Sequence, residues 1–121
     1  MLNLDTHMVV ALLQGDLRPT EKLFVLKEEW AISDIVLWEL AKLVQLSRLE
    51  MDFENAGFRE FLKIVTIFPI SREIAWHSTR LDFVSDPADE IIAATSLVEE
   101  IPLLTRDRRL LGSRMVPLAR V

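Results

Sequence analysis

The sequence contains no cysteine, which excludes disulfides, thiolate nucleophiles and cysteine-ligated zinc or iron–sulfur centres. It has only three glycines, and no glycine-rich phosphate loop is present. No apolar run reaches about 18 residues, and the first one, residues 8–13, lacks the basic flank of a signal peptide. We therefore expect a cytoplasmic protein without a membrane anchor, in which any metal is held by oxygen or histidine.

The composition predicts one folded domain over residues 1–121, because half of the residues are apolar. No internal repeat, low-complexity segment or linker divides the chain. The net charge of −5 argues against a protein that coats nucleic acid through its overall charge. A local basic rim is still compatible with that charge.

Short apolar strands alternate with helical patterns along the chain. We expect strands at residues 1–5, 30–33, 66–70, 101–105 and 114–119. Helices are expected between them at residues 6–14, 19–29, 35–44, 54–65, 71–81, 86–100 and 106–112. This alternation is typical of an α/β fold with a parallel sheet covered on both faces, in which sites lie at the carboxyl ends of the strands.

One acid interrupts an apolar helix in the segment IVLWELAKLV. At about 100° per residue, Glu39 shares an arc of this helix with Ile35, Leu43 and Leu46. An unpaired carboxylate in an apolar setting costs several kcal/mol or takes up a proton. We therefore expect Glu39 to face a metal ion or a water bound to one.

Three more acids, Asp5, Asp89 and Asp107, lie at expected strand ends or helix starts. Each one alone has a simple interpretation as a helix cap. In a right-handed βαβ sheet, however, all three can converge with Glu39 at one edge. Two carboxylates about 5 Å apart repel by roughly 3 kcal/mol at an effective dielectric of about 20. Oxygen ligands of this kind predict Mg²⁺ or Mn²⁺.

The segments LDTH, ISDIVLWEL, SDPADEIIAATSL and PLLTRDRRL resemble, in order and spacing, the motifs of PIN-domain ribonucleases, in particular the VapC toxins. The resemblance implies a three-layer α/β/α sandwich with a central, mainly parallel sheet. It also implies a metal-dependent endoribonuclease that cuts RNA and pairs with a cognate antitoxin. Carried over to this sequence, the acidic site falls on Asp5, Glu39, Asp89 and Asp107, with Thr6, Ser33 and Thr105 beside the metal or the substrate.

The sequence departs from the family pattern near the third acid. Glu90 stands where many relatives have arginine, and Val84 and Ser85 stand where many have a basic or histidine pair. Both departures make the surroundings of the acids more negative. Phosphate contacts are instead expected from a group of arginines around the last acid, namely Arg106, Arg108, Arg109 and Arg114, for which a solvated helix face is the alternative.

Trp38 is expected on the polar arc of the Glu39 helix, so something should cover its ring. A homodimer interface or an antitoxin groove is one interpretation, and a neighbouring loop is the other. His7 follows closely after Asp5, but a lone histidine at a helix start is more often structural than functional, and His77 is unassigned.

Two other functions are compatible with parts of the sequence. A catalytically idle PIN-like module that binds RNA or protein would fit Glu90 beside the third acid. A phosphatase of similar topology is disfavoured, because that chemistry needs a second aspartate two residues after Asp5, where this sequence has His7.

Overall fold

The computed structural model describes residues 1–121 and contains a four-stranded sheet in the order β3-β2-β1-β4. Its strands are β1 (Leu2–Leu4), β2 (Trp30–Ser33), β3 (Thr66–Phe68) and β4 (Leu103–Leu104). All neighbouring strands are parallel, and Asn3 pairs with Ala31 on one side and Leu103 on the other. The predicted α/β fold with a parallel sheet is confirmed.

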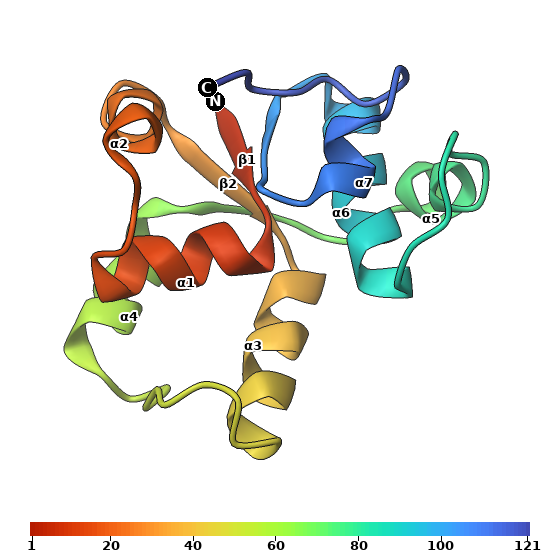
Figure 1. Cartoon of the computed structure of the whole chain (residues 1–121). Coiled ribbons are helices and arrows are strands. Elements are labelled where there is room, and N and C mark those ends of the chain that lie inside the picture. Colours follow the sequence, from red (N-terminus) through yellow and green to blue (C-terminus); the bar gives the residue numbers. More distant parts are fainter.

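Seven helices surround the sheet (Figure 1). They are α1 (Thr6–Gln14), α2 (Pro19–Val25), α3 (Ile35–Gln45), α4 (Ala56–Ile64), α5 (Arg72–Ser78), α6 (Pro87–Glu99) and α7 (Arg108–Leu111). Figure 1 shows α1, α2 and α4 on one side of the strands and α5, α6 and α7 on the other, as the three-layer prediction requires. None of these helices combines the length and the apolar character needed to cross a membrane.

Strand β1 lies at the centre of the fold and is buried on both faces. Leu2 and Leu4 are each 1% exposed and belong to the main apolar core. Asn3 points the other way, because successive side chains of a strand alternate between faces. Its Nδ2 donates to the Ile92 carbonyl at 3.2 Å and to Ser96 Oγ at 2.9 Å, which joins β1 to α6.

The prediction of a strand at residues 114–119 is wrong, because the structure has only an isolated bridge between Leu118 and Leu103 there. Side chains occupy the amides that a strand would need. Asp82 Oδ2 accepts the Arg114 N–H at 2.7 Å, and Ser113 Oγ accepts the next two N–H groups at 3.1 Å each. Pro117, further along, has no N–H to donate.

Helix α1 ends at Gly15, as the sequence indicates. Gly15 adopts a left-handed backbone conformation with a φ of 76°, and its N–H caps the last turn of the helix. A Cβ atom at this position would meet nothing within 4 Å. The requirement for glycine therefore comes from the backbone angle and not from a steric neighbour.

We predict that Gly15→Ala lowers the free energy of unfolding by about 1 kcal/mol, the cost of a left-handed backbone for an L-residue. Urea unfolding measures the difference. Gly112→Ala serves as a control, because Gly112 has an ordinary φ of −82°. Equal losses in both variants would show that the backbone angle of Gly15 carries no special cost.

Candidate functional site

The candidate site lies where the order of the strands reverses. The chain passes from β1 to β2 to β3 in one direction and then returns to place β4 on the other side of β1. In parallel α/β sheets, ligands bind beyond the carboxyl ends of the strands at such a reversal point. Asp5 directly follows β1, and Thr105 directly follows β4.

Asp5 is 5% exposed and forms hydrogen bonds with two segments of the chain. Its Oδ1 accepts the Met8 N–H at 2.9 Å, so it caps α1, and its Oδ2 accepts the hydroxyl of Thr105. Burial raises the pKa of Asp5, and the nearby charge of Asp89 adds to that rise, whereas the two hydrogen bonds oppose it. Asp5 is thus both a helix cap and a desolvated acid at the strand end.

Asp107 follows Thr105 by two residues in the segment that leads from β4 to α7. Its N–H donates to Thr105 Oγ1 at 3.0 Å, and its Oδ1 accepts the Arg109 N–H at 2.8 Å. Asp107 therefore caps α7, in agreement with the simple interpretation of this acid. The hydroxyl of Thr105 joins Asp5 to Asp107 through one oxygen atom.

The prediction that Glu39 shares an apolar face of its helix with Leu46 is wrong in one respect. Helix α3 buries Val36 and Leu40, whereas Leu46 is 57% exposed. Glu39 is half-buried at the edge of that buried face, and its Oε1 accepts the hydroxyl of Thr6 from α1. The helical period alone did not show which side α1 and α6 would cover, and both pack against α3.

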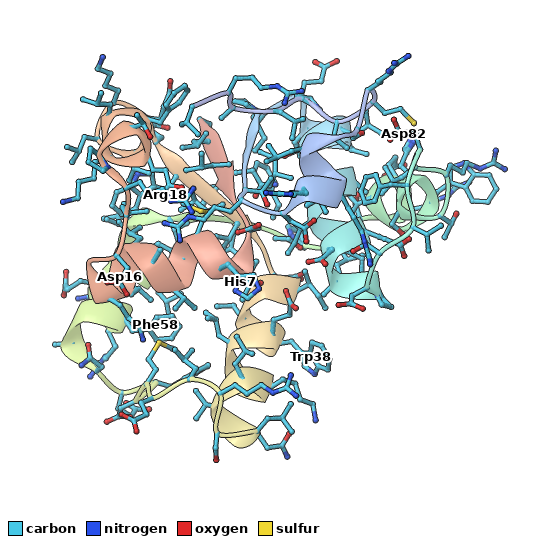
Figure 2. All side chains as sticks on the ribbon, in the orientation of Figure 1. His7, Asp16, Arg18, Trp38, Phe58 and Asp82 are labelled. Atoms are coloured by element: carbon cyan, nitrogen blue, oxygen red, sulfur yellow. The ribbon has the colours of Figure 1, made fainter.

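Desolvation is the largest cause of a raised pKa at Glu39. The negative charges of Asp89 and Asp5 raise that pKa further, whereas the hydrogen bond from Thr6 and the neighbouring His7 lower it. Figure 2 shows His7 at the start of α1, close to the first turn of α3. The carboxylates of Glu39 and Asp5 therefore repel each other across the junction of α1 and α3.

Asp89 lies in the first turn of α6 and is also partly buried. Its Oδ2 accepts the hydroxyl of Ser85 at 3.0 Å. The interpretation of Asp89 as a helix-capping acid is not supported, because the N-cap residue Asp86 makes no side-chain cap hydrogen bond with which Asp89 could form a capping box. Burial raises the pKa of Asp89, Asp107 and Asp86 raise it further, and Ser85 opposes the rise.

The structure thus brings the four predicted acids into one electrostatic group, in which Asp89 interacts with Asp5, Glu39 and Asp107. As they stand, no three of the chain's Asp, Glu and His side chains are arranged to hold one metal ion. Three of the acids instead accept hydroxyls, from Thr105, Thr6 and Ser85. Oxygen donors that repel one another suit a hard divalent cation. Closing around one requires these side chains to rotate.

The three predicted hydroxyl residues have different surroundings. Thr6 and Thr105 donate to Glu39 and Asp5, as described above. Ser33 is fully buried at the end of β2, and its Oγ accepts the Ile35 N–H at 3.3 Å at the start of α3. Ser33 thus supports the turn that leads into the Glu39 helix.

Arg106, predicted to contact the substrate, is engaged within the protein. Its Nε and Nη2 donate to the two carboxylate oxygens of Glu21 at 2.8 and 2.6 Å, and Nη2 also donates to the Asp16 carbonyl at 3.1 Å. Glu21 is 2% exposed, and the hydrogen bonds from Arg106 hold the pKa of Glu21 below its ordinary value. Sequence reasoning missed Glu21, since its partner lies 85 residues away.

A hollow opens beside the acids and is lined by Asp5, His7, Asp16, Arg106 and Asp107, with Val10 and Ala11. Trp38 lies outside this hollow, on the side of α3 away from α1 (Figure 2). Trp38 as a residue is 55% exposed, and the Nζ of Lys42 lies 5.9 Å from the centre of its ring. No loop of this chain therefore covers the ring.

The family model of the PIN domain matches residues 3–112 of this chain. Three solved structures have a similar fold: a toxin–antitoxin complex from Klebsiella pneumoniae, VapBC2 from Rickettsia felis bound to a DNA fragment from its promoter, and FitAcB from Neisseria gonorrhoeae. They are 24%, 20% and 17% identical, with TM-scores of 0.71, 0.73 and 0.71. The matches cover 93%, 98% and 99% of this chain and 92%, 98% and 97% of those chains. No curated protein matches.

We predict that Glu39→Gln raises the free energy of unfolding of the metal-free protein at about pH 7. The folded-state pKa of Glu39 is raised, so this acid costs stability once the pH exceeds its unfolded pKa of about 4.3. The gain from Gln should shrink toward pH 4, where the acid is mostly protonated in both states. Gln also keeps the oxygen that accepts the hydroxyl of Thr6.

Urea unfolding in EDTA at both pH values measures this effect. Glu54→Gln is the control for loss of one negative charge, because Glu54 lies exposed in the loop before α4. A loss of several kcal/mol in Glu39→Gln at both pH values would contradict the prediction and would indicate a structural ion pair.

Proposed function

Because the chain belongs to the PIN domain family, we propose that it is a divalent-metal-dependent endoribonuclease, with residues 1–121 as one PIN-like domain. In this proposal it hydrolyses RNA phosphodiester bonds in the cytoplasm and is the toxin of a type II toxin–antitoxin pair. The observation that carries the proposal is the group of mutually repelling, desolvated acids at the reversal point of the sheet. Such clusters are typical of catalytic sites.

Mg²⁺ or Mn²⁺, when bound, would supply an activated water and would neutralise charge on the reacting phosphate. The ion would be bound by four acids, Asp5, Glu39, Asp89 and Asp107. Asp5 is held in place by Met8 and Thr105, so its carboxylate is already oriented. Glu39 would help to hold the ion or orient the attacking water, because its half-buried carboxylate lies beside the hydroxyl of Thr6.

The partners follow from the fold and from one exposed side chain. The solved structures with a similar fold are described as a toxin–antitoxin complex, VapBC2 and FitAcB. We propose an antitoxin as a partner of this chain on that ground. The exposed ring of Trp38 is a suitable contact for the antitoxin or for a second copy in a homodimer.

A catalytically idle module that binds RNA or protein is the second candidate function. It is favoured by Glu90, whose Oε2 accepts the Ser85 N–H at 3.4 Å and adds negative charge near Asp89. Cleavage of RNA separates the two functions, because an idle module would bind RNA without cutting it.

We predict that Mn²⁺ raises the melting temperature of the protein. Binding to the folded state alone stabilises it by about 2.7 kcal/mol at a metal concentration about a hundredfold above the dissociation constant. Thermal unfolding with and without Mn²⁺ measures the shift. A melting temperature that is indifferent to millimolar Mn²⁺ would count against the metal site.

We also predict that Asp107→Asn reduces RNA cleavage in Mn²⁺ by at least about a hundredfold, the order of magnitude expected when an electrostatic group of an active site is lost. The substitution keeps the oxygen that accepts the Arg109 N–H, so α7 remains capped. Asp52→Asn is the matched control, because Asp52 Oδ1 accepts the Glu54 N–H in the same way but lies in an exposed loop. Equal activity in both variants would exclude Asp107 from the mechanism.

A further inference from the structure

A second hollow lies next to the acidic one and is basic. Its lining includes Arg18, Arg106, Arg108 and Arg120, which come from the start of α2, the segment after β4, α7 and the C-terminal segment. Four of the chain's 14 lysines and arginines therefore gather at one place, although the chain as a whole has a net charge of −5. The sequence alone indicated only two of these four, Arg106 and Arg108.

Three of these arginines have charge available for a ligand. Arg106 is neutralised by Glu21, which also lines the hollow. Arg18 and Arg108 form no ion pair, and Arg120 donates only Nη1 to the Leu111 carbonyl at 3.3 Å. All three are exposed at the surface. Guanidinium groups arranged in this way are well suited to phosphate oxygens, which they contact through two donors at once.

The two hollows share a wall. Arg106 lines both of them, and Thr105 lines the basic hollow while its hydroxyl donates to Asp5 in the acidic one. A nucleic acid strand that places one phosphate at the acids would thus carry a neighbouring phosphate to the arginines. We propose that Arg18, Arg108 and Arg120 form a binding site for a backbone phosphate of single-stranded RNA, next to the bond that is cut. This inference rests on the proposed function.

The structure also separates arginines that are adjacent in the sequence. Arg109 lines neither hollow, and it contacts the site through its backbone N–H, which donates to Asp107 Oδ1. Arg114 also lines neither hollow, and its N–H donates to Asp82. If charge alone attracted RNA, these two residues would contribute as much as Arg108 does.

The test measures binding of a fluorescein-labelled single-stranded RNA by anisotropy, in EDTA to prevent metal-dependent cleavage. The salt dependence of the binding constant is followed between about 50 and 200 mM KCl. Each phosphate contact contributes about 0.7 to the log–log slope for single strands. Arg18→Gln, Arg108→Gln and Arg120→Gln combined remove the one proposed contact, so the triple variant should reduce the slope by about 0.7. A triple lysine variant at the same positions should keep most of the slope, since lysine also carries the charge.

The matched control is a triple variant with the same change of charge, Arg48→Gln, Arg109→Gln and Arg114→Gln. We expect the slope of this control to stay near that of the unchanged protein. An equal reduction in both triple variants would overturn the proposal, because it would show that RNA responds to overall charge alone. An unchanged slope in the first variant would overturn it as well. Melting temperatures verify that each variant is folded.

Cleavage by the unchanged protein in Mn²⁺ is measured separately, so the two proposals can fail independently. Cleavage with an unaltered slope in the first triple variant would remove the phosphate site and leave the nuclease. A reduced slope without any cleavage would support the phosphate site in an idle RNA-binding module and remove the proposed catalytic function.

Discussion

The carboxylate of Asp5 is the junction on which the arrangement of the candidate site depends. Through Met8 it fixes the start of α1, and through Thr105 it ties the end of β1 to a segment that is 100 residues away in the sequence. The same hydroxyl then positions the backbone of Asp107. A single buried side chain thus sets the positions of two strand ends and two helix starts.

Hydroxyl groups keep this junction stable despite its negative charge. Thr6 follows Asp5 in the sequence but donates to Glu39, whereas Thr105 precedes Asp107 but donates to Asp5. The hydroxyls therefore link acids on different segments. Burial raises the pKa of Asp5 and of Glu39, and the hydrogen bond from each hydroxyl partly offsets that rise.

Local signals explain why most of the fold could be predicted. Gly15 ends α1 and Pro87 begins α6, because these residue types act through their own backbone geometry. The convergence of the four acids followed from the topology of a parallel sheet. The strand at residues 114–119 was predicted wrongly, because apolar pattern does not reveal that Asp82 and Ser113 take its amides.

Contacts between distant segments could not be predicted. Glu21 looks like an ordinary acid in the first turn of a helix, and nothing in the sequence near it indicates Arg106. The grouping of Arg18 and Arg120 with Arg108 was missed for the same reason, since it exists only after the chain has folded. The burial of Glu39 was predicted too strongly, because the helical period does not specify the neighbours.

The ion pair of Glu21 and Arg106 also constrains how this protein can change over generations. Loss of Arg106 alone would leave a carboxylate that is 2% exposed without its cation, and loss of Glu21 would free a cation beside the acids. An apolar pair could fill the same space, but only if both residues were replaced together. We therefore expect positions 21 and 106 to covary in evolution, so that the residue at one position predicts the residue at the other.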